Sequence, residues 1–454
     1  MPEHDDFDER LAQRLRAYES RIPDGEIPMT ESRSARRSRS ALAAGGVIAV
    51  GALAGVLVAV VLLNRPAAET GESPSPSASG QATPSAEASA VPSETAGPSS
   101  AAPSASAPAE AYTTIVLGDQ GTAAVATSGP SGAVILGFDD AGPVAWHSAD
   151  GQTWQPASFS EAPAVDMRPT AVVASELGYV AILANCISEC FGGQMWYSAD
   201  GTSWTATSTA VTGGILAHLA AGGPGFVAIA IDPFAAGSPG VTPTVLSSAD
   251  GQTWEADEPA DLLEANVHAL GSMGDLLVAL GTRNAETGQL DGSWITADGR
   301  SWDRYDDDTD RAAAFDMAWN GEELLAVGQG ECPGGVGSAD QCPGEAAIAW
   351  HSTDGRTWLP ALADPCCGGL SDVAATPSGW VATVTPGHPA FPDAPPALAG
   401  QVGEAEWLAV EIDAGGELIL QSVAVHEGLV LFVGEVRQGD VPQPVVIVFS
   451  QPLP

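Results

Sequence analysis

The sequence contains no lysine. All 16 of its basic residues are arginine, against 57 aspartate and glutamate residues, which gives a formal net charge of -41 at pH 7. Proteins that bind nucleic acid neutralise phosphate groups with a basic surface. The charge balance therefore excludes nucleic acid as a partner and predicts an acidic protein kept soluble by self-repulsion.

Motifs of common catalytic and metal sites are also absent. The sequence has no Gly-x-Ser-x-Gly, no phosphate-binding loop and no His-Glu-x-x-His. The acidic run Asp306 to Asp310 lacks the glycine and the distal glutamate of an EF-hand loop. We therefore expect no cofactor and no metal ion, and we expect this acidic run to be a solvated loop.

One apolar run is long enough to cross a membrane. Residues Ala41 to Leu63 are 23 residues without a charge, and about 20 suffice to span a bilayer. Four arginines directly precede this run, so the positive-inside rule places residues 1–40 in the cytoplasm. A cleaved signal peptide is the competing interpretation, but the run is too long and the leading segment too extended. The sequence predicts a single-pass signal anchor in the plasma membrane.

The segment after the apolar run has little that can fold. Residues 64–110 are almost entirely Ala, Ser, Pro, Glu, Gly and Thr, and such a segment cannot bury enough apolar surface to offset its ordering entropy. Its prolines favour a semi-extended spacer. We predict a disordered linker between the membrane and an outer domain at 111–454.

A heptapeptide of the form Ser/Thr-x-Asp-Gly-x-Thr/Ser-Trp occurs five times in this outer domain. Its aspartates are 50, 50, 48 and 56 residues apart, a period typical of repeat architectures. We call each copy a box. The aspartates and tryptophans of the boxes are Asp150, Asp200, Asp250, Asp298, Asp354, Trp154, Trp204, Trp254, Trp302 and Trp358.

A second repeat accompanies the boxes. A glycine followed by a short apolar run recurs at Gly132, Gly178, Gly225, Gly274, Gly321, Gly379 and Gly428. Each unit reads as four strands, as in Ile215 to Ala221, Phe226 to Ile231, Pro243 to Ser247 and a strand after the box tryptophan. Four strands at this period are typical of a β-propeller blade.

The seven glycines predict an all-β, seven-bladed propeller. The sixth unit has no intact box, but its spacing locates a degenerate copy at Gly403 to Trp407. The last unit has room for three strands before the sequence ends, and the segment Tyr112 to Leu117 precedes the first unit without a partner. We predict that this N-terminal segment supplies the fourth strand of the last blade.

The box has a structural chemistry of its own. Its Asp and Ser side chains accept backbone N–H groups in a tight turn, and its Gly takes a positive φ. Its Trp is expected to lie between neighbouring sheets, with the indole N–H donating to a carbonyl. The sequence thus favours a folding role for the box aspartates over a catalytic one.

The motif resembles the Asp box of the sialidase-like propellers, also called the bacterial neuraminidase repeat, and the resemblance covers Ala111 to Pro454. Here the glycine is one residue closer to the aspartate than in the usual sialidase form, a variant of bacterial propellers of unassigned activity. The resemblance implies that the box lies between the third and fourth strands, opposite the functional face. That functional face would carry the loops Asn185 to Gln194, Asp232 to Thr242, Thr282 to Gly292, Gln329 to Glu345 and Pro386 to Pro396.

All six cysteines fall in these loops or in the connection Pro365 to Gly369, on the side where disulfides are allowed. No zinc-site spacing accompanies them, so we expect disulfides of open connectivity. The candidates are Cys186, Cys190, Cys332, Cys342, Cys366 and Cys367.

A sialidase activity would require an arginine cluster, a tyrosine nucleophile with its glutamate, and an acidic proton donor. Four arginines fall near the loop face: Arg168, Arg283, Arg311 and Arg437. The phenylalanine-arginine-isoleucine-proline signature of sialidase domains is absent, and Tyr179 and Tyr197 lie within predicted strands.

We therefore predict a monomeric, noncatalytic binding or scaffold module at the cell envelope. The four arginines are its candidate ligand contacts, and its ligand is an envelope protein, a glycan or a small molecule. A sialidase-like glycoside hydrolase is one alternative. Another is a transmembrane sensor that signals through a short amphipathic helix at Asp8 to Arg21.

Overall fold

A computed structural model of the chain describes residues 112–453, except for 187–189, 211–213, 233–239, 284–289, 312, 331–345, 365–368, 386–394, 403–406, 440 and 452. The predicted cytoplasmic tail, signal anchor and linker lie outside these described residues. Within the described part of the chain, no helix has the length and apolar character needed to cross a membrane.

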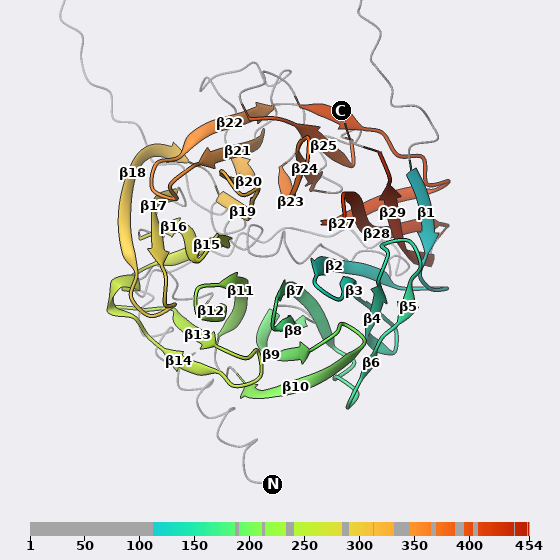
Figure 1. The fold of residues 1–454 in the computed structure, drawn as a ribbon, viewed down its shortest axis with the longest axis horizontal. Helices are drawn as coiled ribbons and strands as arrows, with labels where there is room; N and C mark the ends of the chain where they lie inside the picture. The colour runs from blue at the N-terminus through green and yellow to red at the C-terminus, as the bar shows by residue number, and fades with distance from the viewer. Residues whose placement is uncertain are drawn as a thin grey trace, which may run out of the picture. The chain divides into compact units, whose positions relative to one another are not determined.

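The described residues form an all-β ring of antiparallel sheets around a central axis, as in a β-propeller (Figure 1). Each sheet is built from strands that follow one another in sequence, with the first strand nearest the axis and the fourth at the rim. The groups are β2 (Thr122–Gly129), β3 (Gly132–Asp139), β4 (Gly142–Ser148) and β5 (Gln155–Pro156); β7 (Met167–Ser175), β8 (Gly178–Cys186), β9 (Cys190–Ser198) and β10 (Ser203–Ala210); β11 (Ile215–Gly222), β12 (Gly225–Ile231), β13 (Thr244–Ser248) and β14 (Glu255–Asp257); β15 (Asn266–Met273), β16 (Leu276–Thr282), β17 (Leu290–Thr296) and β18 (Asp303–Arg311); β19 (Ala313–Trp319), β20 (Leu324–Gly330), β21 (Ala346–Ser352) and β22 (Leu359–Asp364); β23 (Leu370–Thr376), β24 (Gly379–Val384), β25 (Ala397–Gly400) and β26 (Leu408–Val410); and β27 (Glu417–His426), β28 (Leu429–Gln438) and β29 (Val441–Phe449).

Two of these groups are continuous with one another. A single parallel residue pair, Ile215 with Gly192, joins β11 to β9. The short strand β6 (Ser158–Phe159) follows β5 and pairs in parallel with β10 of the next group. A short 3-10 helix, Ala260–Leu262, connects β14 to β15.

The ring is closed by the two ends of the described chain. β1 (Tyr112–Val116) pairs antiparallel with β29, in the register Tyr112 to Phe449 and Val116 to Val445. The prediction that the N-terminal segment completes the last sheet is therefore confirmed. The rings of Tyr112 and Phe449 lie 5.0 Å apart at this junction.

The core lies between neighbouring sheets. One cluster combines Val227 of β12 with Leu277 of β16 and the box Trp302, and another joins Ile135 of β3 to Leu431 of β28. Because a sheet packs on both sides, its second strand is buried on both faces. This explains why these strands read as continuous apolar runs such as GAVILGF and not as an alternation.

Every innermost strand carries a one-residue bulge near its beginning. Each time, two residues of the first strand oppose one residue of the second, so the bulge re-aims the side chain that follows it. The residues that follow the bulges are Val125, Ala171, His218, Ala269, Asp316, Asp372 and Ser422.

Two loop predictions were wrong. The expected loop Asn185 to Gln194 is mostly strand, because β8 continues to Cys186 and β9 begins at Cys190, with these two residues in register. The acidic run Asp306 to Asp310 also belongs to a strand, β18, where pairing with β17 continues across a register shift.

The predicted disulfides find no support in the described part of the chain, which shows none. Only the backbone of Cys186 and Cys190 is described. Cys332, Cys342, Cys366 and Cys367 lie outside the described residues.

Candidate functional site

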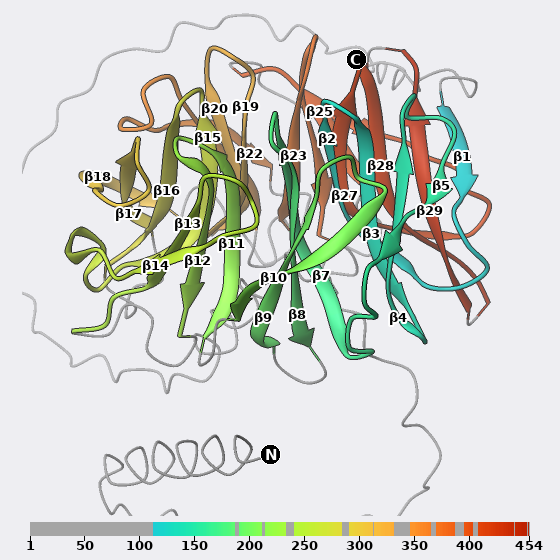
Figure 2. The same ribbon diagram turned by 60° about the horizontal axis from the view of Figure 1, so that its bottom comes forward.

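Strand direction defines two faces of the ring. In the five sheets with an intact box, the turn between the third and fourth strands, which carries the box, lies on the same side as the turn between the first and second. We call this side the box face, and the opposite side, where second strands end and first strands begin, the loop face. Figure 2 shows the strands running between the two sides.

The box aspartate accepts hydrogen bonds from the residues of its own turn. In the first box, Asp150 Oδ1 accepts the N–H groups of Gln152 and Thr153 at 2.9 and 2.6 Å, and the Ser148 hydroxyl at 3.0 Å. In the third box, Asp250 Oδ1 accepts the equivalent three groups at 2.7 to 3.1 Å. The carboxylates at Asp200, Asp298 and Asp354 accept equivalent N–H groups.

These bonds favour the ionised carboxylate. Backbone N–H groups of the turn lower the pKa of Asp150, Asp200, Asp250 and Asp298 below the ordinary value of 3.8. At Asp354 burial acts in the opposite direction, but hydrogen bonds from the turn outweigh it and the pKa is again lowered. A catalytic acid needs the reverse shift, so the box carboxylates are suited to holding a turn.

The box glycine makes the contact between sheets. Gly201 has φ +81, and a Cβ added to it would lie 2.6 Å from Cγ2 of Val134, on β3 of the preceding sheet. A Cβ added to Gly251 would likewise contact the side chain of Tyr197, and one added to Gly355 would contact that of Val278, each in the preceding sheet. The first box repeats the pattern across the ring closure, where Gly151 faces Leu429 of β28. Each box therefore fixes its own sheet to the one before it.

Four of the five box tryptophans are buried, and the fifth, Trp154, is partly buried against its cluster. Trp204 and Trp358 are fully buried, and their clusters include second-strand residues of the preceding sheet. The prediction for their N–H groups holds only in part. Trp254 and Trp358 donate to the carbonyl of their own box glycine at 3.2 Å, whereas Nε1 of Trp154, Trp204 and Trp302 is buried without a hydrogen-bond partner among the described residues.

Trp407 occupies the position expected for a degenerate sixth box. It directly precedes β26 and packs with Leu325 and Val327 of β20 in the preceding sheet. Only 5% of it is exposed. The preceding residues 403–406 lie outside the described part of the chain.

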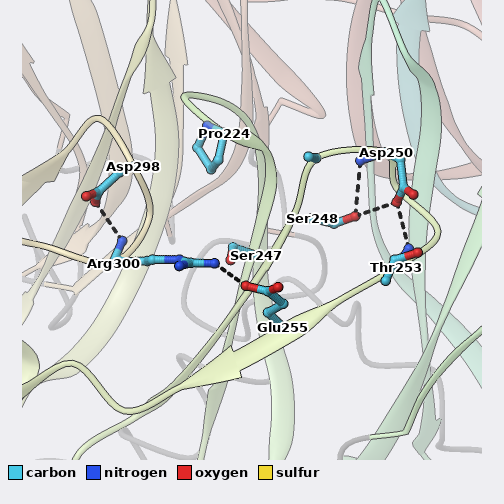
Figure 3. Close-up of a pocket in the computed structure, with 9 residues that line it drawn as sticks. Pro224, Ser247, Ser248, Asp250, Thr253, Glu255, Asp298 and Arg300 are labelled. Atoms are coloured by element: carbon cyan, nitrogen blue, oxygen red, sulfur yellow. Dashed lines mark hydrogen bonds and ion pairs between the residues drawn. The ribbon is translucent and has the colours of Figure 1, made fainter.

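A surface hollow lies between the third and fourth boxes (Figure 3). The residues that line it are Pro224, Ser247, Ser248, Ala249, Asp250, Thr253, Glu255, Asp298 and Arg300. Arg300 reaches back from its box and forms an ion pair with Glu255 on β14 of the preceding sheet. Arg356 in the next box also reaches back to the preceding sheet, where its guanidinium lies 4.6 Å from the ring of Tyr305. The hollow is thus bordered by groups that already connect neighbouring sheets.

The four candidate arginines lie at or next to the loop-face ends of strands. Arg168 is at the start of β7, Arg283 directly follows β16, Arg311 ends β18, and Arg437 is near the end of β28. Arg283 and Arg311 belong to the same sheet, whereas β18 and β28 lie on opposite sides of the ring (Figure 1), so Arg437 is in a different sector from these two.

Two of these arginines are engaged by local groups. Arg168 donates from Nη1 to the carbonyls of Val165 and Met167 at 2.8 Å, and its guanidinium lies 4.3 Å from the ring of Phe138. Arg437 donates to the fully buried carboxylate of Glu435 at 2.7 Å. Arg168 and Arg437 share none of these partners.

One further arginine, which was not among the four candidates, is also engaged. Arg304 on β18 donates to Asp291 at 3.3 Å, forms an ion pair with Asp306, and lies 5.5 Å over the ring of Trp294. The same Asp291 carboxylate accepts the backbone N–H of Arg283 at 3.1 Å. The side chain of Arg311 is not described. Arg283, Arg304 and Arg311 therefore belong to a single sheet.

The innermost strands bring together titratable residues that no sequence pattern indicated. His218 contacts the carbonyl of Val267 at 3.0 Å, and burial lowers the pKa of His218 and His268 to about 4. Asp316 and Asp372 occupy the equivalent post-bulge positions on β19 and β23. Among the described residues no three His, Cys, Asp or Glu side chains are placed to hold a metal ion.

No family model and no curated protein matches the sequence. Solved structures similar to this fold include YCF48 bound to a peptide, at 14% identity and a TM-score of 0.47, covering 77% of this chain and 98% of that one. A catalytically inactive virginiamycin B lyase from Staphylococcus aureus with quinupristin matches at 10% identity and a TM-score of 0.46, covering 74% and 98%. The Trypanosoma rangeli sialidase matches at 13% identity and a TM-score of 0.34, and this chain covers 55% of it.

Proposed function

We propose that the chain is a noncatalytic binding module: a seven-bladed Asp-box propeller, anchored in the plasma membrane at 41–63 and displayed outside the cell. The blade number is supported by the strand groups, which count seven when β1 is taken with β27–β29 and the sheets joined at Ile215 and Gly192 are taken as two. Its ligand is an envelope protein or glycan bound on the loop face.

One observation carries this proposal. The box carboxylates, which recur at a nearly constant spacing, accept hydrogen bonds from the backbone of their own turns. The box face therefore serves the contacts between sheets. The loop face is therefore the surface on which we place ligand binding, because binding residues are commonly found on loops held by a rigid scaffold.

The tyrosines support a noncatalytic role over a sialidase-like one. Tyr179 donates its hydroxyl to the carbonyl of Gly132 at 2.8 Å, and Tyr197 donates to that of Leu177 at 2.8 Å. Tyr112 is bonded to Asp413, and Tyr305 lies under Arg356. All four lie toward the box-face ends of their strands, away from the candidate arginines. Burial raises the pKa of Tyr179, which opposes the phenolate that a nucleophile needs.

The ligand test compares the two faces. The full-length protein in detergent is assayed against a glycan array and against purified envelope proteins. Arg168→Gln should reduce ligand retention, because it removes a loop-face charge while keeping a polar side chain. The matched control is Arg300→Gln on the box face, which should bind like the wild type. Hydrolysis of a fluorogenic sialoside by the wild type would contradict the noncatalytic role, and equal effects of both substitutions would contradict the choice of face.

Anchoring and export are tested with a reporter. Alkaline phosphatase fused after the last residue should be active outside the cell and should sediment with membranes. Deleting 41–63 should abolish both results. An active reporter in the soluble cytoplasmic fraction would overturn the proposed topology.

The cysteines provide a separate test of the compartment. We propose that the six cysteines are paired outside the cell, where disulfides persist. Denatured protein from intact cells should accept a thiol reagent only after reduction. Six reactive thiols before reduction would contradict the pairing.

A further inference from the structure

Two carboxyl groups meet between the innermost strands β19 and β23. Oδ2 of Asp316 accepts the backbone N–H of Val373 at 3.0 Å. Oδ1 of Asp372 accepts the same N–H at 2.8 Å. Because both oxygens lie about 3 Å from one nitrogen atom, the two carboxyl groups are direct neighbours.

The second carboxyl group continues the contact to the next strand. Oδ2 of Asp372 accepts the N–H of Val423 on β27 at 2.9 Å. Asp316 and Asp372 thus each bond the backbone of the following sheet, because the inner-strand bulge directs both side chains toward it. Ser422 repeats the contact one sheet further on, where its hydroxyl accepts the N–H of Ala126 at 3.3 Å.

Two neighbouring carboxylates cannot both be ionised without strong repulsion. Burial at the inner strand, and then the charge of Asp372, raise the pKa of Asp316 well above its ordinary value. A hydrogen bond between the two side chains acts in the same direction. A proton on Asp316 would lie between the two groups and replace their repulsion with a hydrogen bond.

We infer that Asp316 and Asp372 share a proton and act together as a proton-dependent link between three consecutive innermost strands, β19, β23 and β27. With the proton in place, one continuous series of hydrogen bonds runs from β19 to the backbone of β27. Loss of the proton leaves two adjacent carboxylates at the seam between sheets. The link is strongest in acid and weakens as the pH rises.

Other titratable groups on the surrounding strands have partners of their own. On β15, His268 lies near Asn266, and on β21, His351 contacts Glu323 at 3.2 Å. On β27, His426 contacts Ser128 and the carbonyl of Ala149, and Glu417 is exposed at the beginning of the strand. The charge that acts on Asp316 is that of Asp372.

The direction of the pH dependence follows from the raised pKa. A carboxyl group with a folded-state pKa above its unfolded value contributes its full stability below the unfolded value of 3.8. That contribution is lost as the pH rises through the folded-state pKa. Within this window each pH unit lowers the folding equilibrium constant by up to about tenfold.

The test is the thermal unfolding midpoint of the full-length protein in detergent from pH 5 to pH 9, for the wild type and Asp316→Asn. The asparagine donates to Asp372 at every pH and carries no charge. We expect the wild-type midpoint to fall toward pH 9 and the variant midpoint to fall less, so that the variant exceeds the wild type at pH 8 to 9. Equal slopes for the two proteins would overturn the link.

A matched control separates the shared proton from a simple loss of a bond. Ser422→Ala removes the equivalent contact without a titrating group, so its midpoint should shift by the same amount at every pH. If Ser422→Ala changed the pH dependence of the midpoint as much as Asp316→Asn does, a shared proton would not explain that pH dependence. Asp372→Asn provides a second test. It removes the other charge of the pair, so the thermal unfolding midpoint of this variant should also fall less with rising pH than that of the wild type.

Hydrogen exchange of the wild-type protein tests the proton-dependent link even if no variant folds. After correction for intrinsic exchange, peptides containing Val373 and Val423 should lose protection between pH 6 and pH 9. Peptides from the inner strands that carry Val125 and Ala171 at the same position should keep theirs. Uniform behaviour of all four strands would contradict the link.

Discussion

Nε of Arg437 donates to Oε1 of Glu435 at 2.7 Å, and this pair lies next to the ring closure. Glu435 is fully buried, and its other oxygen accepts the hydroxyl of Thr122, at the start of β2. One buried carboxylate therefore connects the last sheet to the first. Arg437 was a candidate ligand contact by sequence, and its geometry indicates that it also stabilises the fold.

Removing the guanidinium should therefore destabilise the ring. Arg437→Ala leaves a buried charge with one weaker donor, and we expect a loss of about 2–4 kcal/mol in the free energy of unfolding. Denaturant unfolding of the full-length protein measures it. Thr122→Val, which removes only a neutral hydroxyl, should cost about 1 kcal/mol. A wild-type unfolding curve for Arg437→Ala would show that the pair is not structural.

The box glycines should tolerate no side chain. Gly201→Ala combines a positive φ with a Cβ 2.6 Å from Cγ2 of Val134, and we expect a cost of about 2–4 kcal/mol from backbone strain and overpacking together. Gly274 also has a positive φ, +61, but has open space around it. Gly274→Ala should therefore cost only about 1–2 kcal/mol, the strain alone.

A compensating substitution tests the cause of the Gly201 effect. Val134→Ala makes room for the new Cβ, so the pair Val134→Ala and Gly201→Ala should be less destabilised than the sum of the two single changes. Strict additivity in the unfolding free energies would mean that the contact between sheets is not what the glycine protects.

The box aspartates should make the protein sensitive to strong acid. Their folded-state pKa values are lowered, so their contribution is present above the unfolded value of 3.8 and is lost as the pH falls through the folded values. Circular dichroism below pH 4 should show cooperative unfolding. Asp298→Asn should lower the thermal unfolding midpoint at pH 7 and reduce the fall of that midpoint between pH 4 and pH 2. A variant whose midpoint falls as steeply as that of the wild type in this range would contradict the explanation.

The closing strand should be required for stability through its tyrosine. Tyr112 contacts the Phe449 ring, and its hydroxyl is bonded to both the N–H and the carbonyl of Asp413. Tyr112→Phe should cost about 1 kcal/mol, for the hydroxyl alone, and Tyr112→Ala about 3 kcal/mol, for the ring as well. Thermal midpoints of the two variants measure the difference, and identical values would mean that the ring contact is not stabilising.

Much of the fold was visible in the sequence because propeller sheets repeat locally. The glycine at or before the second strand marks a position in all seven units, and the box before the fourth strand does so in five of them, so strand limits such as Ile215 and Ile231 were predicted correctly. Closure by Tyr112 to Leu117 followed from counting strands. The failures at Asn185 to Gln194 and at Asp306 to Asp310 have one physical cause. Polar and glycine-rich residues suit loops, but pairing with β8 extends β9 back to Cys190, and pairing with β17 at both Asp306 and Arg311 holds the two ends of the acidic run in β18.

The contacts that matter most around the axis were not predictable. Asp316 and Asp372 are 56 residues apart and belong to no motif. Their meeting depends on an inner-strand bulge, which leaves no recognisable mark in the sequence, and on which sheets become neighbours. Arg304 was overlooked for a similar reason, because its partner Asp291 lies on the adjacent strand.

The backward contact of each box has a consequence for how such a ring can grow. Gly201, Gly251 and Gly355 each rest on a side chain of the sheet made just before them by the ribosome. A newly synthesised sheet therefore finds its binding surface already present, while the first box must wait for β28 at the far end of the chain. For the same reason, a gene duplication that copies one whole unit also copies the box that contacts the preceding sheet, so the added unit needs no new interface.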